Sequence, residues 1–237
     1  DPDESFKNSL LSFALDNLRA PENRVRDGRY FNNQEVFLED AIRRICDVYD
    51  VPYEIALGVG AQESLFVREA ASSAAAHGIY QITEDAFTDA VGISQTFDVR
   101  SIRSGPIRSY STDRYNRLVN IEMFCAYYRF LSHFINPSLD LLEKRLRTLD
   151  PTFSRQTVAE IAILTTYNAG IRRVPDLIKA FVQLSDTEIK KHIGEPPYGL
   201  DVWLGVITSR FGEDRVGKDV FEYAVKVLAR GAAILGE

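Results

Sequence analysis

The chain has 237 residues, of which 45% are apolar and 26% are charged, a composition typical of a globular protein with a sizeable core. Its net charge of −6 argues against nucleic acid as a partner, because phosphate binding draws on a surplus of Lys and Arg. It contains no apolar run of about eighteen residues, so we expect no membrane span. The acidic start, Asp1-Pro2-Asp3-Glu4, is not a signal peptide.

Apolar residues recur at helical spacing along nearly the whole chain, which predicts a mainly α protein with little or no β-sheet. Asn32 and Glu35 are suited to cap one helix, and Pro52 to begin the next. Asp150-Pro151 is suited to close a later helix. Helices are expected, in chain order, over residues 6–18 (packed on the outside), 36–50, 52–63, 113–134, 139–149 and 157–169.

The segment of residues 61–81 places one carboxylate, Glu63, on an otherwise apolar helix. Helical spacing puts Gly60 one turn before it and Phe66 one turn after, so we expect apolar or small neighbours around the carboxyl group. Such surroundings raise a carboxyl pKa, which suits a general acid that donates a proton in glycosidic bond cleavage. The alternative is a partly exposed Glu63 at the end of a core helix, paired with Arg68 or with an arginine distant in sequence.

The helix expected over residues 157–169 is apolar on nearly every face, which predicts that it is buried. Its polar end carries Tyr167 and Asn168, and Gly170 is suited to a left-handed C-cap. Buried polar groups need partners, and a cleft that holds sugar hydroxyls and amides would supply them. Hydrogen bonding to neighbouring backbone is the alternative.

Three groups of residues carry a resemblance to a known family. The first group has eight residues that keep the spacing of the family pattern without a gap: Glu63, Ser64, Phe66, Ala70, Ser72, Ala76, Gly78 and Gln81. Two more groups follow in order: Asn120-Ile121 with Tyr127-Tyr128 and Leu131, then Tyr167-Asn168-Ala169-Gly170 with Arg173-Val174. The pattern resembles that of the soluble lytic transglycosylases and goose-type lysozymes. With a weaker match at residues 221–225, it covers residues 36–228 approximately.

The resemblance implies a single lysozyme-like (goose-type) helical domain with an active-site cleft. The catalytic domain would span residues 36–237, with insertions near residues 98–117 and 195–215, and residues 1–35 would form a helical extension packed on it. Glu63 matches the general acid and base. The residues at matching positions that bind glycan or order the glutamate are Ser64, Ser72, Tyr80, Gln81, Tyr167 and Asn168.

The implied activity is cleavage of the β-1,4 bond between N-acetylmuramic acid and N-acetylglucosamine in peptidoglycan. A lytic transglycosylase needs no second carboxylate, because the same Glu helps the muramic acid 6-hydroxyl close onto C1 and form a 1,6-anhydro product. A hydrolytic goose-type lysozyme, with a possible preference for de-N-acetylated glycan, would need one, and Asp85, Asp89 and Asp98 are candidates. We favour the transglycosylase because its Tyr-Asn-Ala-Gly motif is intact.

A glycan-binding module without turnover is an alternative of a different class, which retention of Glu63 disfavours. Action on peptidoglycan would require export to the periplasm or beyond, with the export signal lost from this chain. We expect a monomer that binds glycan strands without a cofactor. We also expect no metal, because the three histidines are far apart in sequence: His77, His133 and His192.

The chain departs from the family pattern at Val67-Arg68, Ala75 and Ile79-Tyr80. The family has Gly at the position of Ala75, and an alanine there predicts a backbone conformation that does not require a positive φ. Tyr80 places a rigid ring with a hydroxyl near the expected sugar site, which changes the predicted shape of that subsite.

Residues 98–117 hold an arginine cluster on an acidic protein, which could bind carboxylates of peptide stems or belong to a solvated loop. Trp203 could stack on a sugar ring, although its apolar neighbours indicate a core position. Cys46 and Cys125 are expected as buried free thiols, with a disulfide as the alternative after export. The arginines of the cluster are Arg100, Arg103, Arg108, Arg114 and Arg117.

Overall fold

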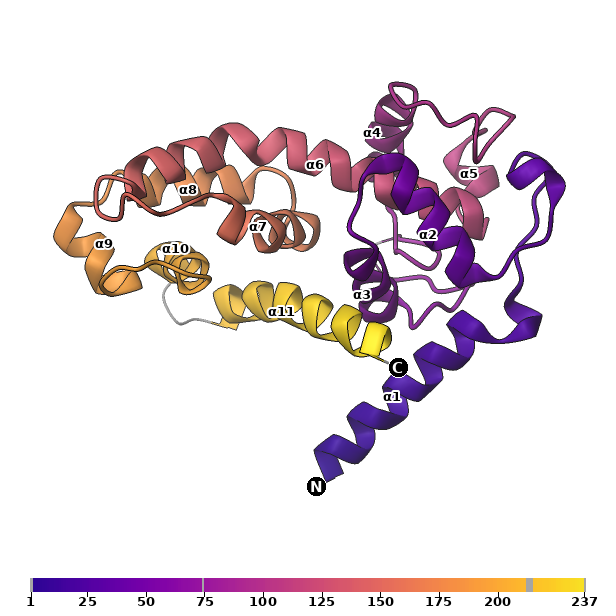
Figure 1. Ribbon diagram of the computed structural model, residues 1–237, viewed down its shortest axis with the longest axis horizontal. Coiled ribbons are helices and arrows are strands. Elements are labelled where there is room, and N and C mark those ends of the chain that lie inside the picture. The colour runs from indigo at the N-terminus through magenta and orange to yellow at the C-terminus, as the bar shows by residue number, and fades with distance from the viewer. Residues whose placement is uncertain (1, 74, 212–214, 237) are drawn as a thin grey trace. The chain divides into compact units, whose positions relative to one another are not determined.

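The computed structural model describes residues 2–73, 75–211 and 215–236. The chain is 66% helical, and its described residues form eleven α-helices and no β-strand, which confirms the predicted mainly α class (Figure 1). None of the helices in these ranges is both long and apolar enough to cross a bilayer. The α-helices are α1 (Pro2–Arg19), α2 (Leu38–Tyr49), α3 (Tyr53–Glu63), α4 (Glu84–Ser94), α5 (Tyr110–Asp113), α6 (Arg117–Leu146), α7 (Gln156–Ala169), α8 (Arg173–Val182), α9 (Asp186–Ile193), α10 (Asp201–Phe211) and α11 (Arg215–Gly236).

The chain divides into two compact units, one of Asp1–Phe130 with Lys226–Glu237 and the other of Leu131–Val225. The boundaries fall inside α6 and α11, so each of these helices contributes to both units. Glu63 lies in the first unit, and Tyr167 and Asn168 lie in the second.

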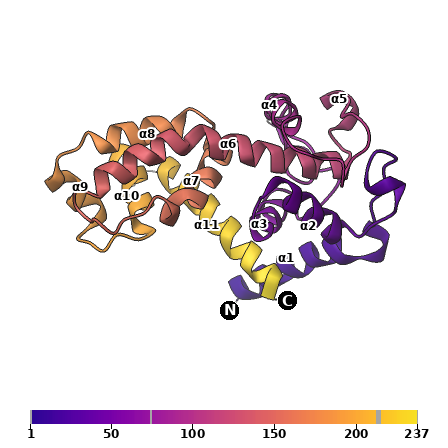
Figure 2. The same cartoon turned by 45° about the horizontal axis from the view of Figure 1, so that its top comes forward.

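Helix α3 forms the centre of the first unit, where its residues 55–61 are all buried. α2 packs against it, and the last turns of α11 cross it closely (Figure 2). A Cβ on Gly58 would lie 2.1 Å from the carbonyl oxygen of Val227, and one on Gly231 would lie 2.1 Å from that of Glu54. Only glycine at both positions allows this crossing, which fixes the helix that ends at Glu63.

The predicted helices near the N-terminus form with shifted boundaries. α1 covers the predicted residues 6–18 and buries Ala14 and Leu18, while the side chain of Phe6 lies outside the described residues. The predicted caps of α2 are wrong: the helix begins at Leu38, and Phe37 occupies the N-cap position without a side-chain bond. Asn32 belongs to a short 3-10 helix (Phe31–Asn33), too far upstream to cap it.

A buried carboxylate anchors the loop between α4 and α6. Glu122 is fully buried in α6 and accepts hydrogen bonds from the hydroxyls of Tyr30 at 2.5 Å and Tyr49 at 2.7 Å. Nε of Arg103 also donates to it, at 2.9 Å. Burial, reinforced by the charge of Glu122, raises the pKa of each tyrosine hydroxyl well above the usual range. Both hydroxyls therefore stay protonated and donate hydrogen bonds. Arg103 therefore holds the loop to the core.

Helix α7 forms the centre of the second unit, and its residues 161–166 are buried, as the sequence predicted. Trp203 of α10 is also fully buried, and its Nε1 donates to Oγ1 of Thr165 at 2.9 Å. The core position of Trp203 is confirmed, and stacking of its ring on an exposed sugar is ruled out in this structure. Gly170 ends α7 with a positive φ of 93° but a ψ of 149°, so it is extended rather than left-handed helical.

Helix α6 replaces two predicted helices. The sequence predicted a break between residues 113–134 and 139–149, but one helix runs from Arg117 to Leu146 with Pro137 inside it. Pro137 is exposed, whereas Leu131, Ile135, Leu139, Leu142 and Leu146 are all buried on one continuous stripe. Burial of this stripe offsets the roughly 3 kcal/mol cost of an interior proline.

Candidate active site around Glu63

Glu63 is the last residue of α3, and its side chain is half-buried. This position at the end of a core helix matches the alternative prediction for Glu63 rather than a fully buried carboxylate. Arg68 forms an ion pair with Glu69, at 3.6 Å. Glu63 thus combines contact with solvent and attachment to a rigid helix.

The chain turns sharply after Glu63, so Phe66 does not lie one helical turn further along, and that prediction is wrong. Leu65 and Phe66 have positive φ values of 52° and 62°, which no continuing right-handed helix allows. The backbone N–H of Phe66 instead donates to the carbonyl of Gly60 at 3.3 Å. Its ring covers Gly60, where a Cβ would lie 2.4 Å from a ring carbon, so Phe66 still supplies an apolar neighbour to the helix end.

Ser64 ties the end of α3 to the predicted turn. Its Oγ donates to the carbonyl of Ile79 at 2.7 Å. Ser64 therefore connects the catalytic candidate to residues 78–81, although the two segments lie fifteen positions apart in sequence.

The turn itself is held from inside by Gln81. Nε2 of Gln81 donates to the carbonyls of Ala70 and Gly78, each at 2.9 Å. The N–H of Gly78 donates to the same Ala70 carbonyl at 2.9 Å. Gly78 has φ of +79°, a conformation that glycine adopts without strain. The amide of Gln81 is thus committed to shaping the turn.

Asn120 brings a second sequence motif to this turn. From the first turns of α6, its Oδ1 accepts a hydrogen bond from the N–H of Tyr80 at 2.8 Å. Its Nδ2 donates to the carbonyl of His77 at 3.1 Å. A Cβ on Gly78 would lie 2.6 Å from that Nδ2, so the turn approaches Asn120 as closely as glycine permits. The sequence placed Asn120 in a family motif but gave no sign of this structural role.

Tyr80 lies in the core rather than on a ligand-accessible surface. Its side chain is fully buried, and its ring stacks on Phe124 with a centroid distance of 4.2 Å and an interplanar angle of 10°. We therefore assign Tyr80 to the packing behind the turn.

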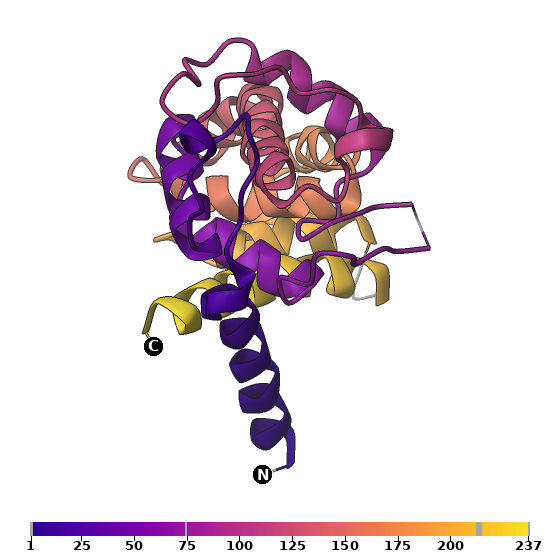
Figure 3. The same ribbon diagram turned by 90° about the vertical axis from the view of Figure 1, so that its right-hand side faces the viewer.

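Ser72 sits on an exposed loop whose two arms run side by side (Figure 3). The N–H of Ser72 donates to the carbonyl of Ala76 at 3.0 Å, and Ala71 bridges His77. Ala75 has φ of +58°, so the expectation that it avoids positive φ is wrong. The hydrogen-bonded arms impose the left-handed conformation on a residue with a Cβ, at a cost that glycine would not have.

His77 and Tyr110 belong to this region but were missed by the sequence analysis. Nδ1 of His77 lies 2.7 Å from the hydroxyl of Tyr110. That hydroxyl is also within hydrogen-bonding distance of two backbone carbonyls, those of Ala75 at 2.8 Å and Ile82 at 3.0 Å. Because one O–H can donate only once at a time, the arrangement suits a His77 that donates from Nδ1. Isolated His and Tyr residues gave no pattern that would have paired them.

The remaining predicted ligand contacts, Tyr167 and Asn168, lie in the last turn of α7 in the second unit. Tyr167 is half-buried and Asn168 is exposed. The structure thus brings Glu63, Ser64, Gln81 and the loop of Ser72 together within one unit, and it places the Tyr-Asn pair in the other.

The candidates for a second carboxylate have different surroundings. Asp85 and Asp89 are exposed and one turn apart on α4. Burial, together with the charges of Asp89 and Asp85, raises the pKa of Tyr127 to about 12, so both carboxylates act on the α6 residue that faces them. Asp98 instead pairs with Arg100 at 2.6 Å, and hydrogen bonds from Arg100 lower its pKa to about 2.

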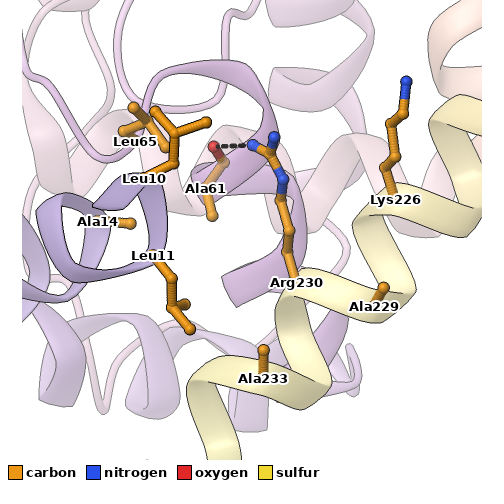
Figure 4. Close-up of a pocket in the computed structure, with 9 residues that line it drawn as sticks. All are labelled: Leu10, Leu11, Ala14, Ala61, Leu65, Lys226, Ala229, Arg230 and Ala233. Carbon is orange, nitrogen blue, oxygen red and sulfur yellow. Dashed lines mark hydrogen bonds between the residues drawn. The ribbon is translucent and has the colours of Figure 1, made fainter. Parts of the chain in front are cut away.

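A cavity of about 370 Å³ opens beside the end of α3 (Figure 4). Its wall is largely apolar, and it includes Ala61 and Leu65, which flank Glu63 in sequence. Nη1 of Arg230 crosses the cavity to donate to the carbonyl of Ala61 at 2.8 Å (Figure 4). The other lining residues are Leu10, Leu11, Ala14, Lys226, Ala229 and Ala233.

Comparison with known proteins adds no assignment. No protein-family model matches the chain, and a search of curated proteins finds no similar one.

Proposed function

We propose that the protein is an exported muramidase that cleaves the β-1,4 bond between N-acetylmuramic acid and N-acetylglucosamine, acting as a lytic transglycosylase. The observation that supports this most is the hydrogen-bonded connection of the helix end at Glu63-Ser64 to the turn at Gly78–Gln81 and to Asn120. Residues of two motifs that are separate in sequence, and that suggested the family, are thus linked through one turn to the helix end that carries Glu63.

In the proposed reaction, Glu63 donates its proton to the glycosidic oxygen as the bond to C1 breaks. The resulting carboxylate then takes the proton of the muramic acid 6-hydroxyl, and that oxygen bonds to C1. Protons balance, no water is consumed, and the product carries a 1,6-anhydro ring. Half-burial of Glu63 suits both steps, since the group must reach a solvent-borne glycan and yet sit on a rigid element.

Apart from Tyr80, which lies in the core, the predicted contacts rest on different kinds of support. The hydrogen bonds of Ser64 and Gln81 favour a role in ordering the segment around Glu63, and the exposure of Ser72 leaves it open to a ligand. The family resemblance alone carries the proposed contacts of Tyr167 and Asn168 with the substrate acetamido group.

The test is mass spectrometry of soluble products after incubation with purified peptidoglycan, in native and de-N-acetylated forms. We expect products one water lighter than reducing muropeptides. Glu63→Gln keeps the size of the side chain but cannot donate the proton, so we expect a rate at least about 100-fold lower. The matched control is Glu22→Gln, an exposed glutamate of the 3-10 helix Pro21–Asn23 that should retain activity.

The second candidate is a hydrolytic lysozyme. The observation that favours it is the exposure of Asp85 and Asp89, which lie one turn apart on α4. Products with reducing ends that disappear in Asp85→Asn or Asp89→Asn would establish it. Equal activity of Glu63→Gln and the parent would refute both enzyme assignments, and binding without any product would indicate a glycan-binding module.

A further inference from the structure

A second cavity, of about 350 Å³, lies in the first unit and is lined by four arginines. They come from three separate segments: Arg24 and Arg26 from the loop after α1, Arg68 from the loop after α3, and Arg117 from the start of α6. Thr112 and Asn116 add polar groups to the wall. No acidic residue lines this cavity in the described part of the chain, although the protein as a whole has a net charge of −6.

Arg117 is half-buried, and its hydrogen bonds go to neutral backbone carbonyls, those of Arg24 at 3.0 Å and Asn23 at 3.4 Å. Among the described residues it forms no ion pair with a carboxylate. Burial lowers its pKa, the positive charge of Arg68 adds to this effect, and the negative charge of Glu69 opposes it without outweighing it. Arg117 is therefore a partly desolvated cation next to another cation, which is unfavourable without an anion.

The other arginines of the cavity are also incompletely neutralised. Arg26 donates to the neutral Oδ1 of Asn33, and within the described ranges it has no carboxylate partner. Arg24 and Arg68 have only loose partners on the surface, Glu35 at 3.8 Å and Glu69 at 3.6 Å. Pairs of this kind are worth little, so these charges remain available to a ligand.

Two other partly buried arginines of the same unit are paired tightly with carboxylates. Arg29 binds Asp27 at 2.8 Å and Asp113 at 2.9 Å, and Arg103 binds Glu122 at 2.9 Å. Asp27, which follows Arg26 in sequence, is held by Arg29 and by Nδ2 of Asn116 at 2.6 Å. The fold thus neutralises Arg29 and Arg103 closely, whereas the arginines at this cavity have only loose acidic partners, or none among the described residues.

We infer that the arginine cavity binds carboxylate groups of an acidic ligand and, resting on the proposed function, that these belong to the peptide stems of peptidoglycan. Planar guanidinium groups bind carboxylates through paired hydrogen bonds. Arg68 follows Glu63 by five residues, so their Cα atoms are at most about 18 Å apart. A stem is attached to the muramic acid whose bond is cut, so one strand can occupy Glu63 and bring its carboxylates within this distance. A free phosphate has no such connection to Glu63.

The test compares two double variants with equal changes in charge. Arg26→Gln with Arg68→Gln removes two cavity charges and spares Arg117, whose backbone hydrogen bonds support the fold. The control, Arg100→Gln with Arg129→Gln, removes two arginines that pair with Asp98 and Asp50 outside the cavity. Circular dichroism checks that both variants keep the helical fold.

Binding is measured by calorimetry with three probes: the free stem peptide, the same peptide with amidated carboxylates, and inorganic phosphate. We expect the parent and the control to bind the free peptide and the cavity variant to bind it at least about tenfold more weakly. We also expect the amidated peptide to bind more weakly than the free one to the parent. Equal affinity in all three proteins would overturn the proposal, and tighter binding of phosphate than of peptide would overturn the assignment to stems.

Cleavage separates this inference from the proposed function. Cleavage kinetics are measured on glycan strands with and without peptide stems. The parent and the control should cleave the stem-bearing strand more efficiently. In the cavity variant this preference should fall about tenfold, because KM for the stem-bearing strand rises. If the parent cuts neither strand, the proposed function fails, and arginine-dependent peptide binding would still uphold the cavity as a carboxylate site. Cleavage with an unchanged preference in the cavity variant would overturn the inference while leaving the proposed function intact.

Discussion

Asn120 holds the turn beside Glu63 with both ends of its amide. It is almost fully buried, accepting from the N–H of Tyr80 and donating to the carbonyl of His77. Asn120→Ala would remove both bonds and leave the N–H of the buried Tyr80 without its partner, while the carbonyl of His77 keeps the hydrogen bond from the N–H of Ile82. We expect a loss of about 2–3 kcal/mol in the free energy of unfolding, measured by urea denaturation, together with reduced turnover.

A matched control is Gln95→Ala, which removes an exposed amide at the end of α4 and should change stability by less than about 0.5 kcal/mol. If Asn120→Ala unfolds at the same urea concentration as the parent, the turn does not depend on the two hydrogen bonds of Asn120. Loss of turnover without loss of stability would instead point to a direct contact of Asn120 with substrate.

Asp27 predicts a pH dependence of stability. Hydrogen bonds from Arg29 lower the pKa of Asp27 from 3.8 to about 2, and Asn116 adds another bond to the same carboxylate. Because the folded-state pKa lies below the unfolded one, its contribution is present in full above about pH 4 and is lost as the pH falls toward 2. We expect Asp27→Asn to be less stable than the parent at pH 7, with a difference that narrows below about pH 4.

Urea midpoints of both proteins at pH 7, 4 and 3 measure this difference. Asp16→Asn, which changes an exposed carboxylate of α1, serves as the control and should follow the parent at each pH. A constant gap between parent and Asp27→Asn across the series would refute the role given to Asp27.

At the level of single residues, the sequence predicted which side chains gather near Glu63 better than what each one does there. Gly78 and Gln81 were indicated by the resemblance to the family pattern, and their hydrogen bonds stay within residues 70–81. The burial of Tyr80 depends on Phe124, which lies forty-four positions away, and the positive φ of Ala75 depends on pairing across its loop. Neither long-range packing nor loop pairing has a signature in the local sequence.

At the scale of the helices, a cysteine of α2 lies next to a cysteine of α6. The Sγ atoms of Cys46 and Cys125 lie 3.7 Å apart, and both residues are fully buried as free thiols. Burial, reinforced by the neighbouring Cys46, raises the pKa of the Cys125 thiol well above its usual range. The thiolate is the reactive form, so the native pair should be nearly inert.

We expect a thiol-specific chromogenic reagent to react slowly with the native protein at pH 8 and to label two thiols quickly above the urea midpoint. Fast labelling of the native protein would contradict the burial of both groups. If unfolded protein that was kept free of reductant also shows no thiol, a disulfide has formed, the alternative that the sequence left open for an exported protein. A disulfide between these two cysteines, which are 79 positions apart, would add about 4 kcal/mol to the free energy of unfolding in the chain-entropy model.

Helical periodicity predicted α1, α2, α3, α6 and the buried α7, because an apolar stripe is a local property of the sequence, and it gave no separate helix for the other six. It failed at the limits of helices. Pro137 indicated a break that packing of the stripe from Leu131 to Leu146 overrides, and α3 ends at Glu63 because Leu65 and Phe66 leave the helical region. Helix ends depend on contacts with other elements, and propensity alone does not decide them.

The whole chain contains two compact units that share two helices. α6 runs unbroken from Arg117 to Leu146 through the boundary after Phe130, and α11 passes through the boundary after Val225. Unfolding of one unit would therefore remove helical hydrogen bonds and buried side chains from segments that continue into the other. We expect the two units to unfold in a single cooperative transition.

Trp203 makes this expectation measurable. It is the only tryptophan of the chain and is buried in the second unit, so its emission follows that unit alone. Asn120 lies in the first unit. If the units unfold together, Asn120→Ala should lower the urea midpoint of Trp203 emission as much as the midpoint of far-ultraviolet circular dichroism. An unchanged emission midpoint beside a lowered dichroism midpoint would show that the units unfold separately, and that the shared helices can fray at the boundary without coupling them.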